Sequence, residues 1–347
     1  MQNSPTSERV GYASSIFNSA QRLAPGLGLS VLVAVAATFI TKLQTGPVLL
    51  YALFLGIAFN YLSAEVRSKP GIEFCSKIVL RLGVGLLGAR ITAGQIAALG
   101  WSTAAIVICA VVSTILFGWL IGRRLGFKAS QGVLCGGSVA ICGASAALAI
   151  SAVLPQTKDS ERFTLMAVVT VTVLSTIAMV LYPLIAQALH FSPELAGLFL
   201  GGTIHDVAQV VGAGYSMSPE VGDVATVVKL FRVAMLAVVV VVIGALFKRS
   251  AAASREPGSP QSKQPIAPWF LWMFVGLVVV NSFDVLPIQL RQNMVDLSQG
   301  CLVVAIAALG MKTSIRELAK SGWRPMALLV GETLWIAAFV LLCICFV

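Results

Sequence analysis

Ionisable side chains inside apolar stretches are the residues of this chain best suited to chemistry. Lys229 and Arg232 lie three positions apart, and Lys77 and Arg81 lie four apart, so each pair shares one face of a helix. A charge at the centre of a bilayer is costly, so such residues face the protein interior and are functional candidates. We expect Arg81, Lys229 and Arg232 to balance the charge of a bound anion. Two alternatives stay open: the charges pair among themselves and only hold helices together, or Lys77 reaches the inner membrane surface.

A titratable cluster forms the second candidate. His205 and Asp206 are adjacent, and Gln209 follows one helical turn later. An aspartate beside a histidine inside a membrane can take up a proton or a sodium ion, so we expect His205, Asp206 and Gln209 to bind a coupling ion. The alternative is a polar anchor that neighbouring backbone groups satisfy. Asp296 and Glu332 are further acids within apolar stretches.

A repeated glycine motif must position these side chains. The pattern G-x-x-x-G-G-[Ser/Thr] occurs at 132–138 and again at 197–203, 65 residues further on. Adjacent glycines weaken a helix, and two breaks at matching positions point to a transporter binding site. The half-helix after each break would offer free N–H groups to an anion, and the hydroxyl of Ser138 or Thr203 would cap that half-helix or contact an oxyanion. The alternative is that the glycines are small contacts that let helices approach closely. The predicted substrate-binding residues of the motif are Gly136, Gly137, Ser138, Gly201, Gly202 and Thr203.

The composition predicts an all-α polytopic membrane protein. Of the 347 residues, 58% are apolar and 11% are charged, whereas a soluble domain is about a quarter charged. A spanning helix needs about 20 mostly apolar residues. Eleven segments qualify: 25–42, 47–63, 72–90, 101–121, 130–152, 163–189, 194–213, 221–247, 267–286, 294–311 and 324–346.

The distribution of basic residues predicts the topology. The net charge is +10, and the basic residues concentrate in the loops that are inside if the N-terminus is cytoplasmic. We therefore expect a cytoplasmic N-terminus and a periplasmic C-terminus in a bacterial inner membrane. Residues 1–24 form a polar cytoplasmic tail without the features of a cleaved signal peptide, and residues 25–347 form the transmembrane domain. A Pro- and Ser-containing stretch at 248–266 reads as a flexible cytoplasmic linker.

Several classes of partner are not expected. The chain has no basic patch interleaved with aromatics that would predict nucleic-acid binding. Its seven cysteines form no C-x-x-C pair and it has only two histidines, so no metal site or other cofactor is predicted. The expected partners are the lipid bilayer and a small anionic substrate, with sodium or protons as the coupling ion. A homodimer is an open option.

A second internal similarity suggests duplicated halves. Residues 87–101 align with 309–323 at a constant offset of 222, and Leu, Gly, Ala, Gly and Trp coincide. If every predicted span crosses the membrane, the two copies run in opposite directions, which is an inverted repeat. The offsets of 65 and 222 do not combine into one tandem duplication. A re-entrant segment, a permuted repeat order and an accidental similarity all remain open.

These motifs resemble a known family. The run Leu-Cys-Gly-Gly-Ser-Val-Ala-Ile-Cys-Gly-Ala-Ser-Ala at 134–146, the run Gly-Gly-Thr-Ile-His-Asp-Val-Ala-Gln-Val at 201–210 and Leu-Gly-Met-Lys-Thr-Ser at 309–314 are similar to the bacterial sulfate-exporter family of YeiH-like inner-membrane proteins, a name that is itself largely a prediction. That family resembles the bile-acid/sodium symporters and cation/proton antiporters. The resemblance implies inverted repeats, a panel domain and a core domain with two broken helices that cross near the midplane.

The sequence thus favours a secondary transporter of a small anion, sulfate or organosulfonate-like, that works by alternating access and is ion-coupled. An anion channel and a sodium-coupled organic-anion symporter are the alternatives. An enzyme is not expected, since no paired carboxylate motif that would bind a metal is present. Direct ATP drive is not expected either, since the chain has no nucleotide-binding motif.

Overall fold

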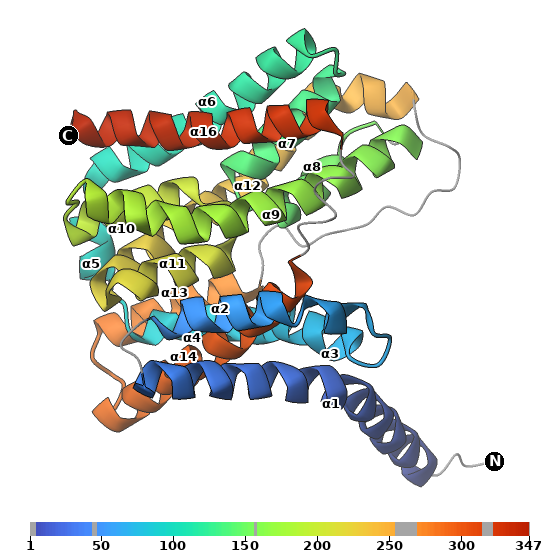
Figure 1. Cartoon of the computed structure of the whole chain (residues 1–347), viewed down its shortest axis with the longest axis vertical. Helices are drawn as coiled ribbons and strands as arrows, with labels where there is room; N and C mark the ends of the chain where they lie inside the picture. Colours follow the sequence, from blue (N-terminus) through green and yellow to red (C-terminus); the bar gives the residue numbers. More distant parts are fainter. Residues whose placement is uncertain (1–4, 44–46, 156–157, 254–268, 314–321, 347) are drawn as a thin grey trace. The chain divides into compact units, whose positions relative to one another are not determined.

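The computed structural model describes residues 5–43, 47–155, 158–253, 269–313 and 322–346, and in these ranges all regular structure is helical (Figure 1). An all-helical chain is what a membrane requires, because a helix satisfies its own backbone N–H and C=O groups. The chain divides into two compact units. Unit 1 comprises residues 1–84 and 296–313, and unit 2 comprises residues 85–295 and 314–347.

Unit 1 is built around the N-terminal helices. Its core contains Ile72, Cys75, Ala308 and Met311, all buried, and Asn60 Nδ2 donates a hydrogen bond to Met311 O at 2.6 Å. The helices of this unit are α1 (Pro5–Leu43), α2 (Val48–Ala58), η1 (Asn60–Ala64), α3 (Lys69–Phe74) and the π-helix η2 (Cys75–Val79), followed by α4 (Leu80–Leu86) and α14 (Ile288–Lys312), which both continue across the boundary.

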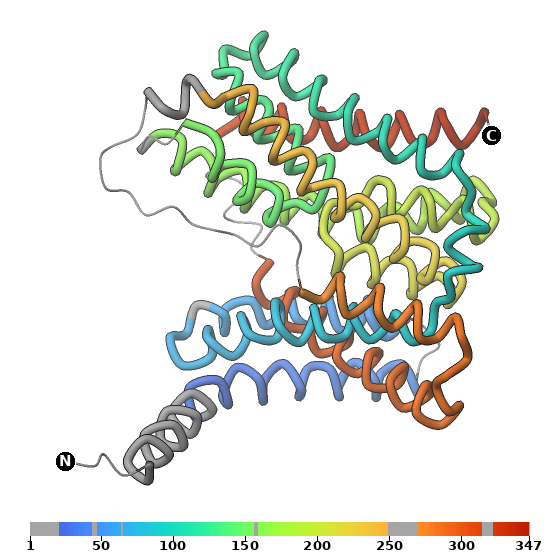
Figure 2. Tube along the Cα trace, turned by 180° about the vertical axis from the view of Figure 1, so that it is seen from behind, coloured from blue at the N-terminus to red at the C-terminus, as the bar shows by residue number. Residues whose placement is uncertain are grey.

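Unit 2 holds most of the predicted site. Its helices are η3 (Leu87–Ala89), α5 (Ala93–Ala98), α6 (Gly100–Arg124), α7 (Ala129–Ala140), α8 (Ala144–Ser151), α9 (Lys158–Ala188), α10 (Pro193–Thr203), α11 (Val207–Met217), α12 (Pro219–Ala253), α13 (Trp269–Ser282) and α16 (Trp323–Cys345). Helix α12 packs along α10 and α11 (Figure 2), and α16 packs against α6, α7, α9 and α10. Charges at the helix ends fit the dipole: α9 begins with Asp159 and Glu161, and α6 ends with Arg123 and Arg124.

The expected eleven spans are only partly matched. Six helices in the described ranges are long and apolar enough to cross a membrane: Gln21–Leu43, Gly100–Arg124, Asp159–Ala188, Pro219–Lys248, Ile288–Lys312 and Trp323–Cys345. The segment 72–90 is a series of short helical pieces that includes the π-helix, and the segments 130–152 and 194–213 are each interrupted. The span predicted at 267–286 contains α13, which is shorter than a full crossing.

Two predicted boundaries look different in the structure. Helix α1 begins at Pro5, inside the segment expected as a polar tail. Helix α12 continues to Ala253, so the start of the predicted linker is helical, while residues 254–266 of the linker lie outside the described residues. Both helices therefore extend beyond the apolar sequence that predicted them.

Candidate functional site

Two helix interruptions lie at the centre of unit 2. Helices α7 and α8 are separated by residues 141–143, and helices α10 and α11 by residues 204–206. The sequence predicted that the helices break at the glycine pairs, and this is wrong. Gly136 and Gly137 lie inside α7, and Gly201 and Gly202 lie inside α10. Helix α7 ends at Ala140, three residues after Gly137, and helix α10 ends at Thr203, one residue after Gly202.

The glycine pairs serve close helix packing. A Cβ atom on Gly136 would lie 2.9 Å from Ile115 Cα of α6, and one on Gly201 would lie 2.5 Å from Ala225 O of α12. Only a residue without a side chain fits at such distances. The alternative interpretation from the sequence, that these glycines let helices approach closely, is therefore correct for Gly136 and Gly201.

The first interruption closes through backbone geometry. Gly143 has φ +62° and ψ −123°, a combination that L side chains rarely adopt, and its N–H donates to Ser138 O at 2.8 Å. Gly143 is the N-cap of α8 and has no side chain to cap it, and the thiol of Cys142 accepts a hydrogen bond from the backbone N–H of Ala146. Gly143 also touches the second interruption, because a Cβ atom there would lie 3.7 Å from the Cβ of His205. The two interruptions are therefore neighbours in space.

The second interruption closes through a side chain. Asp206 is the N-cap of α11, and its Oδ1 accepts a hydrogen bond from the backbone N–H of Ala208 at 2.8 Å. The backbone N–H of Asp206 donates to Ser175 Oγ on α9 at 3.0 Å. A carboxylate is favourable at a helix N-terminus because it satisfies an otherwise unpaired N–H and complements the dipole.

Arg232 of α12 joins the ends of both broken segments. It is fully buried and donates to four backbone carbonyls: Val139 and Ala140 at the end of α7, Gly201 in the last turn of α10, and Ile204 just beyond it, at 2.6–3.1 Å. The last carbonyls of a helix have no partner within the helix. A planar guanidinium with five N–H donors can serve several of them at once.

Lys229, one turn earlier on α12, has the same role. Its ammonium group is fully buried and donates to the carbonyls of Ile141 at 2.6 Å, Ile204 at 2.8 Å and His205 at 2.5 Å. The carbonyl ends of α7 and α10 carry negative partial charge, so the two cations neutralise them. The structure therefore brings Lys229 and Arg232 together with both interruptions, as part of the backbone scaffold.

His205 occupies a defined position beside α16. Its Nε2 lies 3.0 Å from Thr333 Oγ1, and that hydroxyl donates its hydrogen to Leu329 O at 2.7 Å. The direction of this contact depends on which ring nitrogen carries the proton. The other ring nitrogen, Nδ1, is buried and has no hydrogen-bond partner among the described residues.

Gln209 and the two motif hydroxyls complete this region. Gln209 Nε2 donates to Thr176 Oγ1 at 2.8 Å, whereas its buried Oε1 has no partner among the described residues. Ser138 donates to Cys135 O at 2.7 Å and Thr203 donates to Phe199 O at 2.5 Å, each within its own helix. The expected capping of the next half-helix by these hydroxyls is wrong, because their donors point back along α7 and α10.

The other basic pair belongs to unit 1. Lys77, in the π-helix η2, is exposed and lies 3.6 Å from Glu73. Arg81 lies in α4 and is half-buried. Of the three cations predicted to balance a substrate's charge, the structure places two in unit 2, at the interruptions, and one in unit 1.

Sequence reasoning missed the partners of the site. Ser175 and Thr176 on α9, and Thr333 on α16, hold the second interruption in place. Serine and threonine are common in apolar helices, so their presence in the sequence does not indicate a functional site. Glu332, the residue before Thr333, is a fully buried acid that the sequence singled out without a role.

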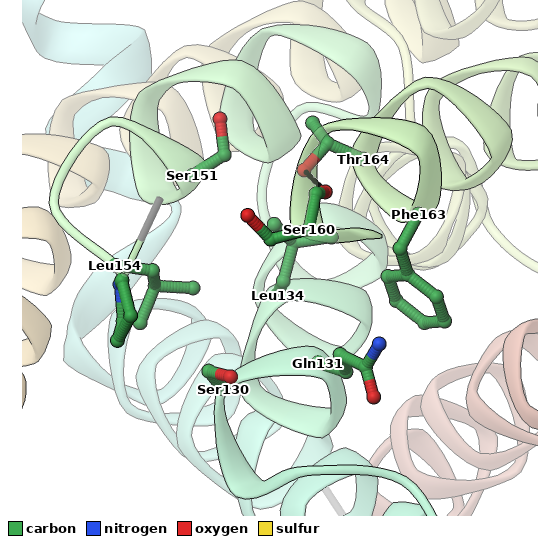
Figure 3. A pocket seen from close by; sticks show the side chains of 9 residues that line it. Ser130, Gln131, Leu134, Ser151, Leu154, Ser160, Phe163 and Thr164 are labelled. Atoms are coloured by element: carbon green, nitrogen blue, oxygen red, sulfur yellow. Dashed lines mark hydrogen bonds between the residues drawn. The ribbon is translucent and has the colours of Figure 1, made fainter. Parts of the chain in front are cut away.

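A small pocket of about 20 Å³ lies elsewhere in unit 2, near the starts of α7 and α9 (Figure 3). Neutral polar and apolar groups line it, and Thr164 Oγ1 donates to Ser160 O at 2.8 Å within α9. None of the predicted site residues is in its lining, which consists of Ser130, Gln131, Leu134, Ser151, Leu154, Pro155, Ser160, Phe163 and Thr164. The pocket therefore carries none of the charges expected of an anion or coupling-ion site.

Comparison with known proteins gives a consistent result. The sequence model of the family described as "Conserved hypothetical protein 698" matches residues 25–329. A UPF0324 membrane protein of Chlorobaculum tepidum is 49% identical over 322 residues, which cover 92% of this chain and 88% of that protein. The UPF0324 membrane protein TauZ of Paracoccus denitrificans is 48% identical over 318 residues, covering 91% and 93%. The similarity thus extends over almost the whole chain.

Proposed function

Since the chain belongs to this family of membrane proteins, described as conserved hypothetical protein 698 and named UPF0324, we propose that it is a secondary transporter of a small anion, sulfate or organosulfonate-like. Membership in this family confirms the resemblance seen in the sequence. The proposed transporter lies in the bacterial inner membrane with its N-terminus cytoplasmic and its C-terminus periplasmic. Its two interrupted helices cross near the midplane and shift in alternating access.

One observation carries this proposal. Two interrupted helix pairs meet in the interior of unit 2, and two fully buried cations of one helix bond to carbonyls of both. At membrane depth an opened backbone must be buried in protein or line a wet cavity. Maintaining two such openings side by side, at the expense of two buried charges, is a feature of transporter binding sites rather than of simple helix packing.

The half-helices after the interruptions differ as anion sites. The start of α11 already holds the carboxylate of Asp206, whereas the N-cap of α8 is Gly143, and no carboxylate caps that end. Free N–H groups at a helix N-terminus favour an anion, and Lys229 and Arg232 neutralise the opposite, carbonyl ends. We therefore place the substrate at the start of α8, and the coupling ion, sodium or a proton, near His205, Asp206 and Gln209.

The repeats support the same architecture. Gly100 and Gly322, which match at the offset of 222, both have positive φ, at +73° and +79°, and each stands at the start of a long helix. A similar positive φ at matched positions favours a true duplication. We propose that α6 and α16 are equivalent helices of inverted repeats.

Counterflow in proteoliposomes tests this function. Vesicles loaded with unlabelled sulfate, or with a small alkanesulfonate, should accumulate the labelled anion transiently, because a carrier exchanges one bound substrate for another. A channel gives no such overshoot, so simple equilibration would favour the channel alternative. Protein-free vesicles are the control. Absence of flux for every sulfur oxyanion, with or without sodium and a pH gradient, would remove the proposal.

A further inference from the structure

Glu332 of α16 is buried at a point where three helices touch. Its side chain has no exposed surface, and neither carboxyl oxygen has a hydrogen-bond partner among the described residues. A Cβ atom on Gly118 of α6 would lie 2.4 Å from its Oε1, 2.7 Å from Gly132 O and 2.8 Å from Gly136 Cα. The carboxyl group therefore lies directly against α6 and against the glycine face of the interrupted helix α7.

The charged side chains on the helices around Glu332 are either exposed or hydrogen-bonded to backbone carbonyls. On α6 these are Arg123 and Arg124, on α9 Asp159, Glu161 and Arg162, on α10 Glu194, and on α16 itself Arg324, all of them exposed. The nearby titratable group on α7 is the buried thiol of Cys135. His205 bonds to the neighbouring Thr333, and Lys229 and Arg232 donate to backbone carbonyls.

A carboxylate in such a place would be unstable. Transfer of an ionised carboxyl group from water to an apolar interior without a partner is so costly that the group takes up a proton instead. The neutral acid needs one acceptor at most, and the carbonyl of Gly132 is at the same helix contact. The closed packing of α6, α7 and α16 is thus compatible with a neutral Glu332 and not with an ionised one.

We propose that Glu332 is a proton-carrying site of the transporter. It holds a proton while α7 is packed on α6 and α16, and releases it to water as H⁺, leaving a carboxylate, when movement of α7 admits solvent. This inference rests on the proposed alternating access and names the proton as a coupled ion. It adds a residue outside the predicted group of His205, Asp206 and Gln209, to which Glu332 is linked through the adjacent Thr333.

Infrared spectroscopy of the purified protein tests the proton directly, without a transport assay. A neutral buried carboxylic acid gives a C=O stretching band above the amide region, which a carboxylate lacks. We expect this band at neutral pH in the wild type, and its loss in Glu332→Gln, which keeps the side-chain volume. Glu194→Gln, at an exposed position of α10, should leave it unchanged. If Glu332→Gln does not fold, Glu332→Asp should shift the band.

The pH dependence of thermal unfolding provides a second measurement. Below about pH 4 the carboxyl is protonated in both the folded and the unfolded chain. At higher pH the unfolded chain loses the proton and the folded chain keeps it, so the wild type should lose stability relative to Glu332→Gln as pH rises. A neutral-acid band that persists in Glu332→Gln, or parallel pH profiles, would overturn the proton site. If the band is present but no anion flux is measured, Glu332 still holds a proton and the proposed transport function is wrong.

Discussion

The two interrupted helix pairs of unit 2 solve one problem in different ways. Between α7 and α8 the chain turns on Gly143, whose positive φ replaces any side-chain cap. Between α10 and α11 it turns on Asp206, whose carboxylate caps the next helix and whose N–H bonds to Ser175. At the positions of His205 and Asp206 the first copy has Ala140 and Ile141.

The two interruptions are alike at their carbonyl ends and differ at the N-terminal ends of the helices that follow. Both need cations at their carbonyl ends, and α12 supplies these to both at once. At the N-terminal ends the first copy has a glycine, Gly143, as its N-cap, while the second has the titratable side chain of Asp206. This asymmetry is why we assign the substrate to one side and ion coupling to the other.

Removal of the shared cations should have the largest effect. Arg232→Met leaves the buried carbonyls of Val139, Ala140 and Gly201 without this donor, at about 1–3 kcal/mol for each group that finds no new partner, while Ile204 O keeps its bond to Lys229. We expect little folded protein, measured by monodispersity and thermal unfolding in detergent. Lys229→Met should behave similarly, and Lys248→Met, at the exposed end of α12, is the control. A stable Arg232→Met protein would mean that the interruptions do not depend on α12.

The glycine pairs offer a contrast between neighbours. Gly201→Ala puts a methyl group 2.5 Å from Ala225 O, whereas Gly202→Ala puts one 3.6 Å from Val340, an ordinary contact. We expect Gly201→Ala to destabilise the protein by about 1–3 kcal/mol through overpacking, and Gly202→Ala to change stability by less than about 0.5 kcal/mol. Thermal unfolding measures both. Equal effects would contradict the packing role assigned to the first glycine of the pair.

The first interruption alone should respond to Gly143→Ala. At φ +62° and ψ −123° a side chain is strained by about 1–3 kcal/mol. Gly126→Ala, at φ +86° with open space around it, carries a comparable backbone penalty away from the interruptions. Both variants should unfold at lower temperature, and only Gly143→Ala should reduce anion counterflow. Equal transport by the two would mean that the turn at residue 143 is merely structural.

A modest effect on stability is expected at the cap of the second interruption. Asp206→Ala removes the cap of α11 and should cost about 1 kcal/mol, while Asp206→Asn keeps an acceptor for the Ala208 N–H and should cost much less. If the carboxylate binds the coupling ion, Asp206→Asn should still lose ion-dependent flux. Wild-type flux in the asparagine variant would reduce Asp206 to a helix cap.

Much of this arrangement was predictable from local features of the chain. Apolar runs predicted helices, and the paired motifs at 132–138 and 197–203 predicted two interruptions within a few residues of their positions. The burial of Lys229 and Arg232 followed from the cost of a charge in an apolar segment. Each of these inferences depends on one segment at a time.

The partners of the buried charges could not be predicted in this way. Lys229 was expected to face an anion, and its described hydrogen bonds instead go to carbonyls 24, 25 and 88 residues away along the chain. The close contact at Gly136 likewise depends on Ile115 of another helix. Such contacts are set by how helices pack, and the sequence of one helix carries no record of what its neighbour presents.

The sequence by itself determined the class of this protein: a helical membrane protein of one family, with charges and paired glycines in its apolar segments. The tertiary structure decided what those residues do, because only folding brings the ends of α7 and α10 to the same side of α12. The open carbonyl groups at the two helix ends then lie within hydrogen-bond distance of Lys229 and Arg232, and each of these cations bonds to both ends.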